Sequence, residues 1–206
     1  MRKCSVALVI GAVWTGTAPT VKADTGLDFQ TTFDQLVAWD PEFAELAPAE
    51  PPDAAHDFVV GSKKVTYISG AFQHLRVSAH SGPSLLDEQG EPLAPGENPK
   101  GTVRLTVSFP ELFFDVKGDV ECLFVNGNIG LVAARIVSLD GALPPVFEGA
   151  THVTLRIFDF GNPGSPPPDD RWDWYFMAPR APIFCAAFGG GGGGGSGNLV
   201  VHDASN

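Results

Sequence analysis

Four side chains with oxygen donors lie close together in a stretch rich in turn residues: Asp159, Asn162, Asp169 and Asp170. Carboxylate and amide oxygens are the ligands that Ca²⁺ prefers in proteins. Their spacing lacks the regular repeat and the closing Glu of an EF-hand, and three consecutive prolines at 166–168 stiffen the path between the acids. Two hypotheses stay open: a Ca²⁺ site, and a rigid hairpin connection whose acids are solvated or cap backbone groups.

Three aromatic residues follow at a spacing of two: Trp172, Trp174 and Phe176. A strand places alternate residues on one face, so the three would lie side by side. Flat aromatic faces near carboxylates suit sugar stacking, but the same pattern is typical of a buried core. With Phe114 and Phe124 they could also line a cavity for a small apolar molecule or a glycan.

Nucleophilic catalysis finds little support in the residue pattern. His80 and Ser81 are adjacent, so on an extended chain their side chains point apart, and no G-x-S-x-G turn is present. The five histidines, at 56, 74, 80, 152 and 202, lack the short spacings of a visible zinc site. We assign no catalytic residue and expect no cofactor other than the Ca²⁺ considered above.

Residues 1–23 have the pattern of a secretory signal peptide. Arg2 and Lys3 precede an apolar run at 4–14, and the tripeptide VKA at 21–23 fits the small-residue rule for cleavage. Glycine, threonine and proline interrupt the run before the roughly 20 apolar residues that a membrane-spanning helix needs. We therefore expect a secreted or periplasmic protein with no stable membrane insertion after cleavage.

The negative net charge argues against some classes of partner but identifies none. The formal net charge is −11, and removal of Arg2, Lys3 and Lys22 with the signal peptide would make it −14. Such a field repels phosphates, so we expect no nucleic-acid partner. The identity of any partner stays unknown.

Two cysteines follow the signal peptide, Cys122 and Cys185. An even pair in an exported chain predicts one disulfide, which the chain-entropy model values at roughly 4 kcal/mol. The alternative, a reactive thiol, lacks a nearby histidine or basic residue in the sequence.

Residues 24–55 form an acidic, proline-rich arm before the main domain. Thr32 and Gln35 resemble a capping box, and Phe33 and Leu36 share a helical face with Val37. We expect a short helix that starts near Thr32 and stops before Pro41, followed by an extended segment.

Residues 56–206 show the period of two that is typical of strands. In the segment 101–109, valine, leucine and phenylalanine alternate with polar residues. Turn residues, among them those at 117–119, 126–128 and 140–141, separate the runs, and no segment is long enough for a crossover helix. We predict an all-β fold, an antiparallel β-sandwich or β-barrel of about 8–11 strands. The expected strands are 57–60, 64–68, 72–79, 101–109, 112–117, 119–125, 129–137, 152–159, 172–177, 183–188 and 198–202.

Two segments of biased composition are predicted to be irregular. Residues 84–95 are a polar insertion and should form a long surface loop. Seven consecutive glycines, 189–195, should give a mobile connection between the last two strands.

Five phrases, taken together, resemble a family of exported bacterial β-rich proteins of unassigned function. They are SAHSGP (78–83), GENPKGTV (96–103), GDVECLFVNGN (118–128), DFGNPGSPPPDD (159–170) and GNLVVHDA (197–204). The resemblance runs from His56 to the end of the chain. It implies an exported all-β domain in which the cysteine of DVECL pairs with a later one, and it implies no known reaction.

The sequence therefore indicates a secreted, non-enzymatic β domain with a structural or interaction role. A barrel or sandwich that binds a small molecule or carbohydrate is the alternative. An open interior cavity would favour the alternative, and a filled interior the first interpretation.

The Ca²⁺ hypothesis predicts that adding Ca²⁺ raises the melting temperature of the purified protein and that a chelator reverses the rise, because a ligand bound only by the folded state stabilises it. Scanning calorimetry measures this. An unchanged melting temperature would leave the acids as turn and capping residues.

Overall fold

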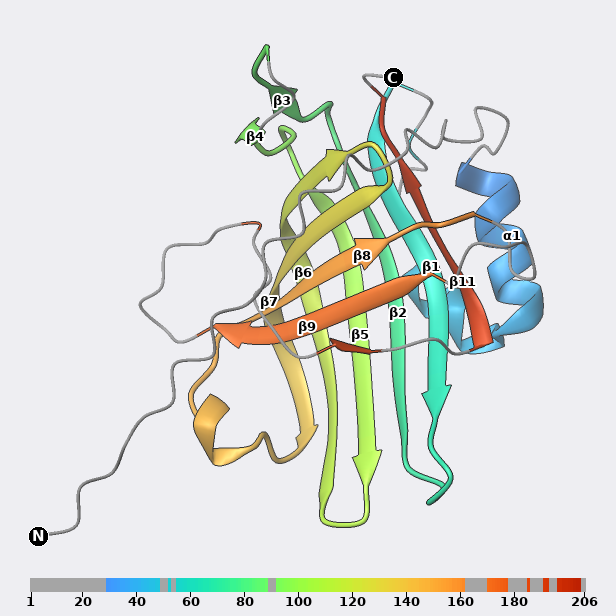
Figure 1. The fold of residues 1–206 in the computed structure, drawn as a ribbon, viewed down its shortest axis with the longest axis vertical. Coiled ribbons are helices and arrows are strands. Elements are labelled where there is room, and N and C mark those ends of the chain that lie inside the picture. Colours follow the sequence, from blue (N-terminus) through green and yellow to red (C-terminus); the bar gives the residue numbers. More distant parts are fainter. Residues whose placement is uncertain are drawn as a thin grey trace, which may run out of the picture.

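The computed structural model describes residues 29–48, 52, 55–88, 92–161, 170–177, 185, 191–192 and 196–204. One antiparallel sheet dominates them, in the order β10-β9-β8-β7-β6-β5-β2-β1-β11 (Figure 1). Its strands are β1 (Asp57–Thr66), β2 (Phe72–Ser81), β5 (Lys100–Phe109), β6 (Leu112–Asn126), β7 (Ile129–Gly141), β8 (His152–Phe158), β9 (Arg171–Met177), β10 (Gly191–Gly192) and β11 (Ser196–His202). A separate hairpin joins β3 (Leu85–Leu86) to β4 (Pro92–Ala94).

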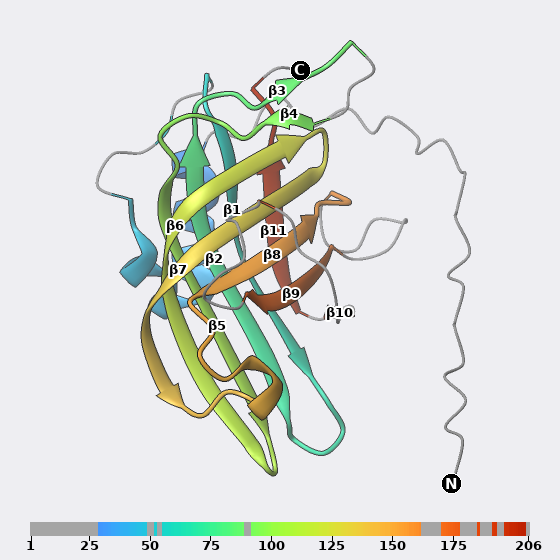
Figure 2. The same cartoon turned by 90° about the vertical axis from the view of Figure 1, so that its left-hand side faces the viewer.

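The sheet curls into a half-barrel, which brings strands from distant parts of its order into contact (Figure 2). Gly130 of β7 shows how tight the curl is: a Cβ there would lie 2.5 Å from a methyl of Val59 in β1 and 3.5 Å from one of Val201 in β11. The all-β, antiparallel prediction is confirmed. A single curled sheet, rather than two packed sheets, forms the domain.

The concave side of the half-barrel is a packed core. Inward residues alternate along each strand, as Leu75, Val77 and Ala79 do on β2, and all three are fully buried. The short 3-10 helix η2 (Pro145–Phe147) places Phe147 against this core. The period of two in the sequence therefore marks the concave face correctly.

The N-terminal arm contains α1 (Phe29–Trp39) and the 3-10 helix η1 (Pro41–Leu46). In Figure 1, α1 lies outside the curl, beside β1 and β11. A second apolar cluster holds the arm there, and its members are Phe29, Phe33, Leu36, Phe43, Leu46, Phe58, Val60 and Val200. The arm thus covers part of the convex face with a core of its own.

The helix of the arm begins earlier than the sequence pattern indicates. It starts at Phe29, so Thr32 is a buried residue inside the helix rather than its cap. Packing of Phe29 against Phe58, with the ring centroids 5.3 Å apart, extends the helix by one turn. The end before Pro41 agrees with the prediction.

Two predicted turns and one predicted loop are wrong. Residues 117–119 form no turn, because β6 continues through them with a register shift at Lys117 and Gly118. Asp140 and Gly141 end β7 instead of turning. The insertion at 84–95 contains the β3–β4 hairpin.

The glycine run and its neighbourhood are described only in part. Gly191 and Gly192 pair with Asp173 and Trp172 of β9, and the other glycines of the run, 189–190 and 193–195, lie outside the described residues. The predicted strand at 183–188 also lies outside them, except for Cys185. This cysteine forms the predicted disulfide with Cys122, with the Cα atoms 5.5 Å apart.

The variant Gly130→Ala tests the curl. We expect it to lower the free energy of unfolding by about 1–3 kcal/mol, since valine is stiff about χ1 and cannot move away from the added methyl. Urea denaturation measures the change. The double variant Gly130→Ala/Val59→Ala should lose less free energy of unfolding than the two single variants lose in sum. Strict additivity of the two losses would contradict the contact.

Candidate functional site

The convex face of β2 carries a row of polar side chains: His74, Arg76, Ser78 and His80. They alternate with the core residues of the same strand, so the pleat directs them outward. All four are nevertheless buried. Because buried polar groups are costly unless they are paired, this row is where chemistry has to be sought.

Asp40 of the arm contacts two side chains of this row, Arg76 and His74, and one side chain of the neighbouring strand β1, Ser62. Its Oδ2 accepts hydrogen bonds from Arg76 Nε at 2.6 Å and from the Ser62 hydroxyl at 2.9 Å. His74 Nε2 lies 2.9 Å from Ser62 Oγ and 3.4 Å from Asp40 Oδ2. We call Asp40, Ser62, His74 and Arg76 the arm latch.

The arm latch contains the residue types of a catalytic triad, but its geometry is different. In a triad the acid holds the histidine nitrogen that faces away from the serine. Here Asp40 contacts the same Nε2 that faces Ser62, and it also accepts the serine hydroxyl directly. Ser62 is fully buried beneath the arm. The cluster therefore suits the attachment of the arm rather than attack on a substrate.

Burial, hydrogen bonds and neighbouring charges together set the protonation states in the arm latch. Burial by itself would raise the pKa of Asp40, but the hydrogen bonds from Arg76 and Ser62 and the charge of Arg76 hold that pKa below its ordinary value. Burial, reinforced by the charge of Arg76, lowers the pKa of His74 to about 4. At neutral pH the latch consists of a carboxylate, a guanidinium and a neutral imidazole.

A second ion-pair group extends the latch across β5. Arg104 donates to Asp115 at 2.8 Å and to Glu45 of the arm at 3.2 Å, and Arg76 contacts Glu42 at 2.8 Å. The hydrogen bonds with Asp115 raise the pKa of Arg104. Acids of the arm, together with Asp115 of β6, thus neutralise Arg76 and Arg104.

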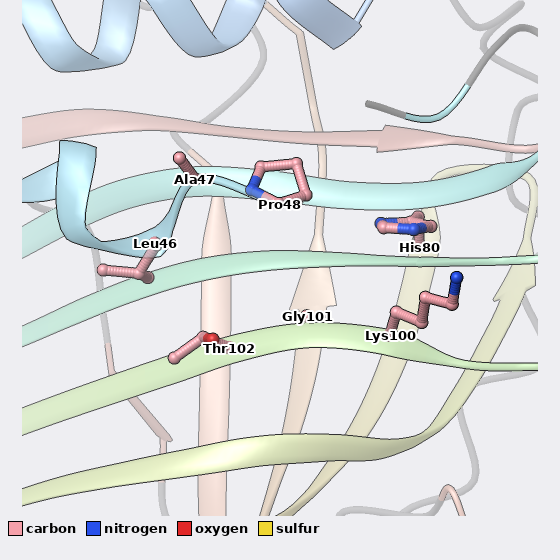
Figure 3. Close-up of a pocket in the computed structure, with 7 residues that line it drawn as sticks. All are labelled: Leu46, Ala47, Pro48, His80, Lys100, Gly101 and Thr102. Carbon is pink, nitrogen blue, oxygen red and sulfur yellow. The ribbon is translucent and has the colours of Figure 1, made fainter. Parts of the chain in front are cut away.

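A pocket of about 350 Å³ opens where the arm ends (Figure 3). Figure 3 shows the ammonium of Lys100 beside the imidazole of His80, with Pro48 facing them from the arm. The lining residues are Leu46, Ala47, Pro48, His80, Lys100, Gly101 and Thr102. Its wall combines an apolar side from the arm with an imidazole and a cation from β2 and β5.

A neighbouring hollow of about 450 Å³ shares His80 and Lys100 with this pocket. It adds His56, Glu97 and Asn98, and the rings of His56 and His80 lie 6.4 Å apart in an edge-on arrangement. We call the two hollows together the His80–Lys100 pocket. Its imidazole, ammonium and carboxylate groups could bind polar or charged groups of a ligand or partner.

Glycine allows the strands around this pocket to approach each other closely. Gly101 has φ of 132°, and a Cβ there would lie 2.0 Å from the carbonyl oxygen of Ser78. The phrases at 78–83 and 96–103 therefore meet at this pocket, where Gly82 N donates to Glu97 O at 2.8 Å.

Hydrogen bonds of the described residues link each of the five phrases quoted above to at least one other. Gly96 N donates to the carbonyl oxygen of Leu123, and Asp159 N donates to that of Asn128. The carboxylate of Asp203 accepts a bond from Gly127 N. The quoted phrases thus contain residues whose hydrogen bonds connect the ends of neighbouring strands and the loops that follow them.

Two of the predicted Ca²⁺ ligands accept backbone hydrogen bonds. Asp159 accepts from the N–H groups of Gly161 and Val201, and Asp170 accepts from those of Phe160 and Leu199, all at 2.8–3.0 Å. Burial raises the pKa of Asp159. Asn162 and Asp169 lie outside the described residues, so the Ca²⁺ site stays a prediction.

The structure places the predicted aromatic binding residues in the core. Trp172 and Phe176 are almost fully buried, and Trp174 packs against Phe114 with ring centroids 5.8 Å apart. Phe124 is also buried. Phe114, Trp172, Trp174 and Phe176 pack together on the concave core, whereas Phe124 alternates with the core residues Leu123 and Val125 and is not part of that cluster.

Sequence reasoning missed the arm latch and the His80–Lys100 pocket. Asp40 and Arg76 are 36 residues apart, and no local spacing connects them. One signal was present: four polar residues alternate along 74–80 within a strand whose other face is apolar. Such a row on a central strand indicates that a polar layer covers it.

Neither a protein-family model, a curated protein nor a solved structure matches the chain. Within the described ranges, no helix is both long and apolar enough to cross a membrane. Nor do three His, Cys, Asp or Glu side chains come together there in a group that could hold a metal ion. The described fold and site define an all-β half-barrel with an arm pinned to its convex face.

The low pKa of His74 predicts that acid weakens the folded protein. The unfolded histidine binds a proton near pH 6.5 and the folded one only near pH 4, so the unfolded state gains protons first. The free energy of unfolding should therefore fall as the pH drops from 6.5 to 4. Urea denaturation across this range measures it.

The variant His74→Gln should lose less free energy of unfolding between pH 6.5 and pH 4 than the wild-type protein does, because glutamine does not titrate. An equal pH dependence in His74→Gln and wild type would contradict the assignment of this effect to the arm latch.

Proposed function

We propose that this chain is an exported, non-enzymatic β domain that serves an interaction role through its convex face. The observation that carries the proposal is the packed concave side. Phe114, Trp172 and Phe176 lie there with at most 2% of their surface exposed. A ligand that entered this side would have to displace core side chains, so the accessible features lie outside the curl.

The arrangement of polar groups on the convex face supports this role. The His80–Lys100 pocket combines an apolar wall with an imidazole and an ammonium group and lies at the edge of the arm. Clefts that combine apolar walls with a few polar groups are the usual places for recognition. In the arm latch, by contrast, Ser62 is fully buried and His74 is neutral, which favours a structural role for that cluster.

Export is supported by the disulfide and by the sequence. Disulfides persist in oxidising compartments outside the cytoplasm. The Cys122–Cys185 bond and the basic–apolar pattern of residues 1–23 both fit this destination. Membership in a family of exported bacterial β-rich proteins stays a prediction that rests on the five phrases.

The alternative is a barrel that binds a small apolar molecule, and one observation favours it. The indole N–H of Trp172 is buried in the core and has no hydrogen-bond partner among the described residues. An unpaired buried donor costs about 1–3 kcal/mol, and a ligand acceptor would satisfy it.

Titration with a fluorescent fatty acid such as cis-parinaric acid separates the two candidates. The packed interior predicts no saturable binding and no energy transfer from the core tryptophans to the probe. Saturable binding that Trp172→Phe weakens would favour the alternative, because phenylalanine fills similar space without the N–H group. The exposed-site variant Phe113→Ala serves as the control, since Phe113 is 45% exposed on β6.

A further inference from the structure

A separate hollow of about 300 Å³ lies between α1 and the start of β11. Residues of the helix form one wall and residues of the strand the other; the lining residues are Thr32, Gln35, Leu36, Trp39, Gly197 and Asn198. Its volume is at the lower end for ligand sites, which suits one small ring. It shares no residue with the His80–Lys100 pocket.

Trp39 gives this hollow an accessible aromatic face. It is 49% exposed, whereas Trp172 is fully buried and Trp174 packs against the core. Tryptophan presents a large flat surface that loses little conformational entropy on binding. Sugar stacking requires such an accessible ring, which neither the buried Trp172 nor the core-packed Trp174 offers.

Asn198 supplies the second, independent observation. Its Oδ1 atom is buried, and no hydrogen-bond partner for it is present in the described part of the chain. An acceptor in this state costs about 1–3 kcal/mol, which a donating ligand would recover once rotation of the Asn198 amide turns the oxygen toward the hollow. A hydroxyl group is such a donor.

The remaining polar groups of the hollow match the same ligand. Gln35, whose side chain is exposed, contributes an amide with two donors and an acceptor. Together, the Gln35 and Asn198 amides can accept from and donate to neighbouring hydroxyls. None of the described lining residues is a lysine or an arginine, and the chain has a net charge of −11, so an anionic ligand fits poorly.

We propose that this hollow binds a neutral pyranose ring. The apolar face of the sugar stacks on Trp39, one hydroxyl donates to Asn198 Oδ1, and an adjacent hydroxyl pairs with Gln35. The proposal rests on the interaction role of the convex face and gives that role a ligand class and a site.

Isothermal titration calorimetry of the purified protein with methyl pyranosides of glucose, galactose, mannose and N-acetylglucosamine, and with the corresponding oligosaccharides, tests the proposal. We expect saturable binding of at least one of them. Trp39→Ala should weaken it about tenfold or more, as removal of a central tryptophan commonly does. Trp39→Phe should keep part of the affinity because a flat ring remains.

Two controls decide between sites. Phe113→Ala removes an aromatic side chain of similar exposure from β6 and should leave the affinity unchanged. Binding that is lost in Lys100→Ala but kept in Trp39→Ala would move the ligand to the His80–Lys100 pocket, which overturns the present proposal and leaves the role of the convex face intact. No saturable heat with any sugar would overturn the proposal directly.

A free monosaccharide and a ring within a glycan chain would give different titration results, and either result would support the site. Binding of the methyl pyranosides indicates recognition of a single free ring. Binding of oligosaccharides alone, with the same loss in Trp39→Ala, indicates that a ring within a glycan chain is recognised.

Discussion

The half-barrel depends on the hydrogen bonding of backbone groups where its sheet stops. β11 is an edge strand, and an edge strand presents N–H groups that the sheet itself does not satisfy. The carboxylates of Asp159 and Asp170 accept two of these, from Val201 and Leu199. Side chains that follow β8 and precede β9 thereby close the curl against β11 without a continuous ladder of strand pairing.

The same device recurs at the end of the half-barrel. Asp57, which is fully buried, accepts bonds from the N–H groups of Ser84 and Ala204 at 2.7 and 2.9 Å. Burial raises the pKa of Asp57, while these two bonds act in the opposite direction. Asp57 therefore joins Asp159 and Asp170, two of the residues considered as Ca²⁺ ligands, in holding loop and strand N–H groups in place.

Among the described residues, the packed concave core leaves the pockets of the convex face as the accessible features. There the arm covers the polar row of β2, and Asp40 neutralises Arg76 where the arm crosses the sheet. The His80–Lys100 pocket and the hollow at Trp39 lie at different edges of this arm. The position of the arm thus determines which parts of the convex face are hollow and which are covered.

The sequence by itself determined the fold class, because alternation of apolar and polar residues is a local property that the chain carries in any fold. It also determined the concave face, the disulfide pair and the end of α1 before Pro41. The strand bounds were predicted less accurately. β6 runs through Gly118 because its pairing with β5 on one side and β7 on the other outweighs the turn preference of residues 117–119.

Only the tertiary structure decided which side chains meet. Asp40 reaches Ser62 and His74 because the arm folds back over β1 and β2. Trp39 and Asn198 line one hollow because β11, at the far end of the chain, pairs with β1. Burial likewise decided that Trp172 is a core residue and Trp39 an exposed one. These contacts join residues far apart in sequence, and their energies depend on packing and dielectric surroundings that no local pattern encodes.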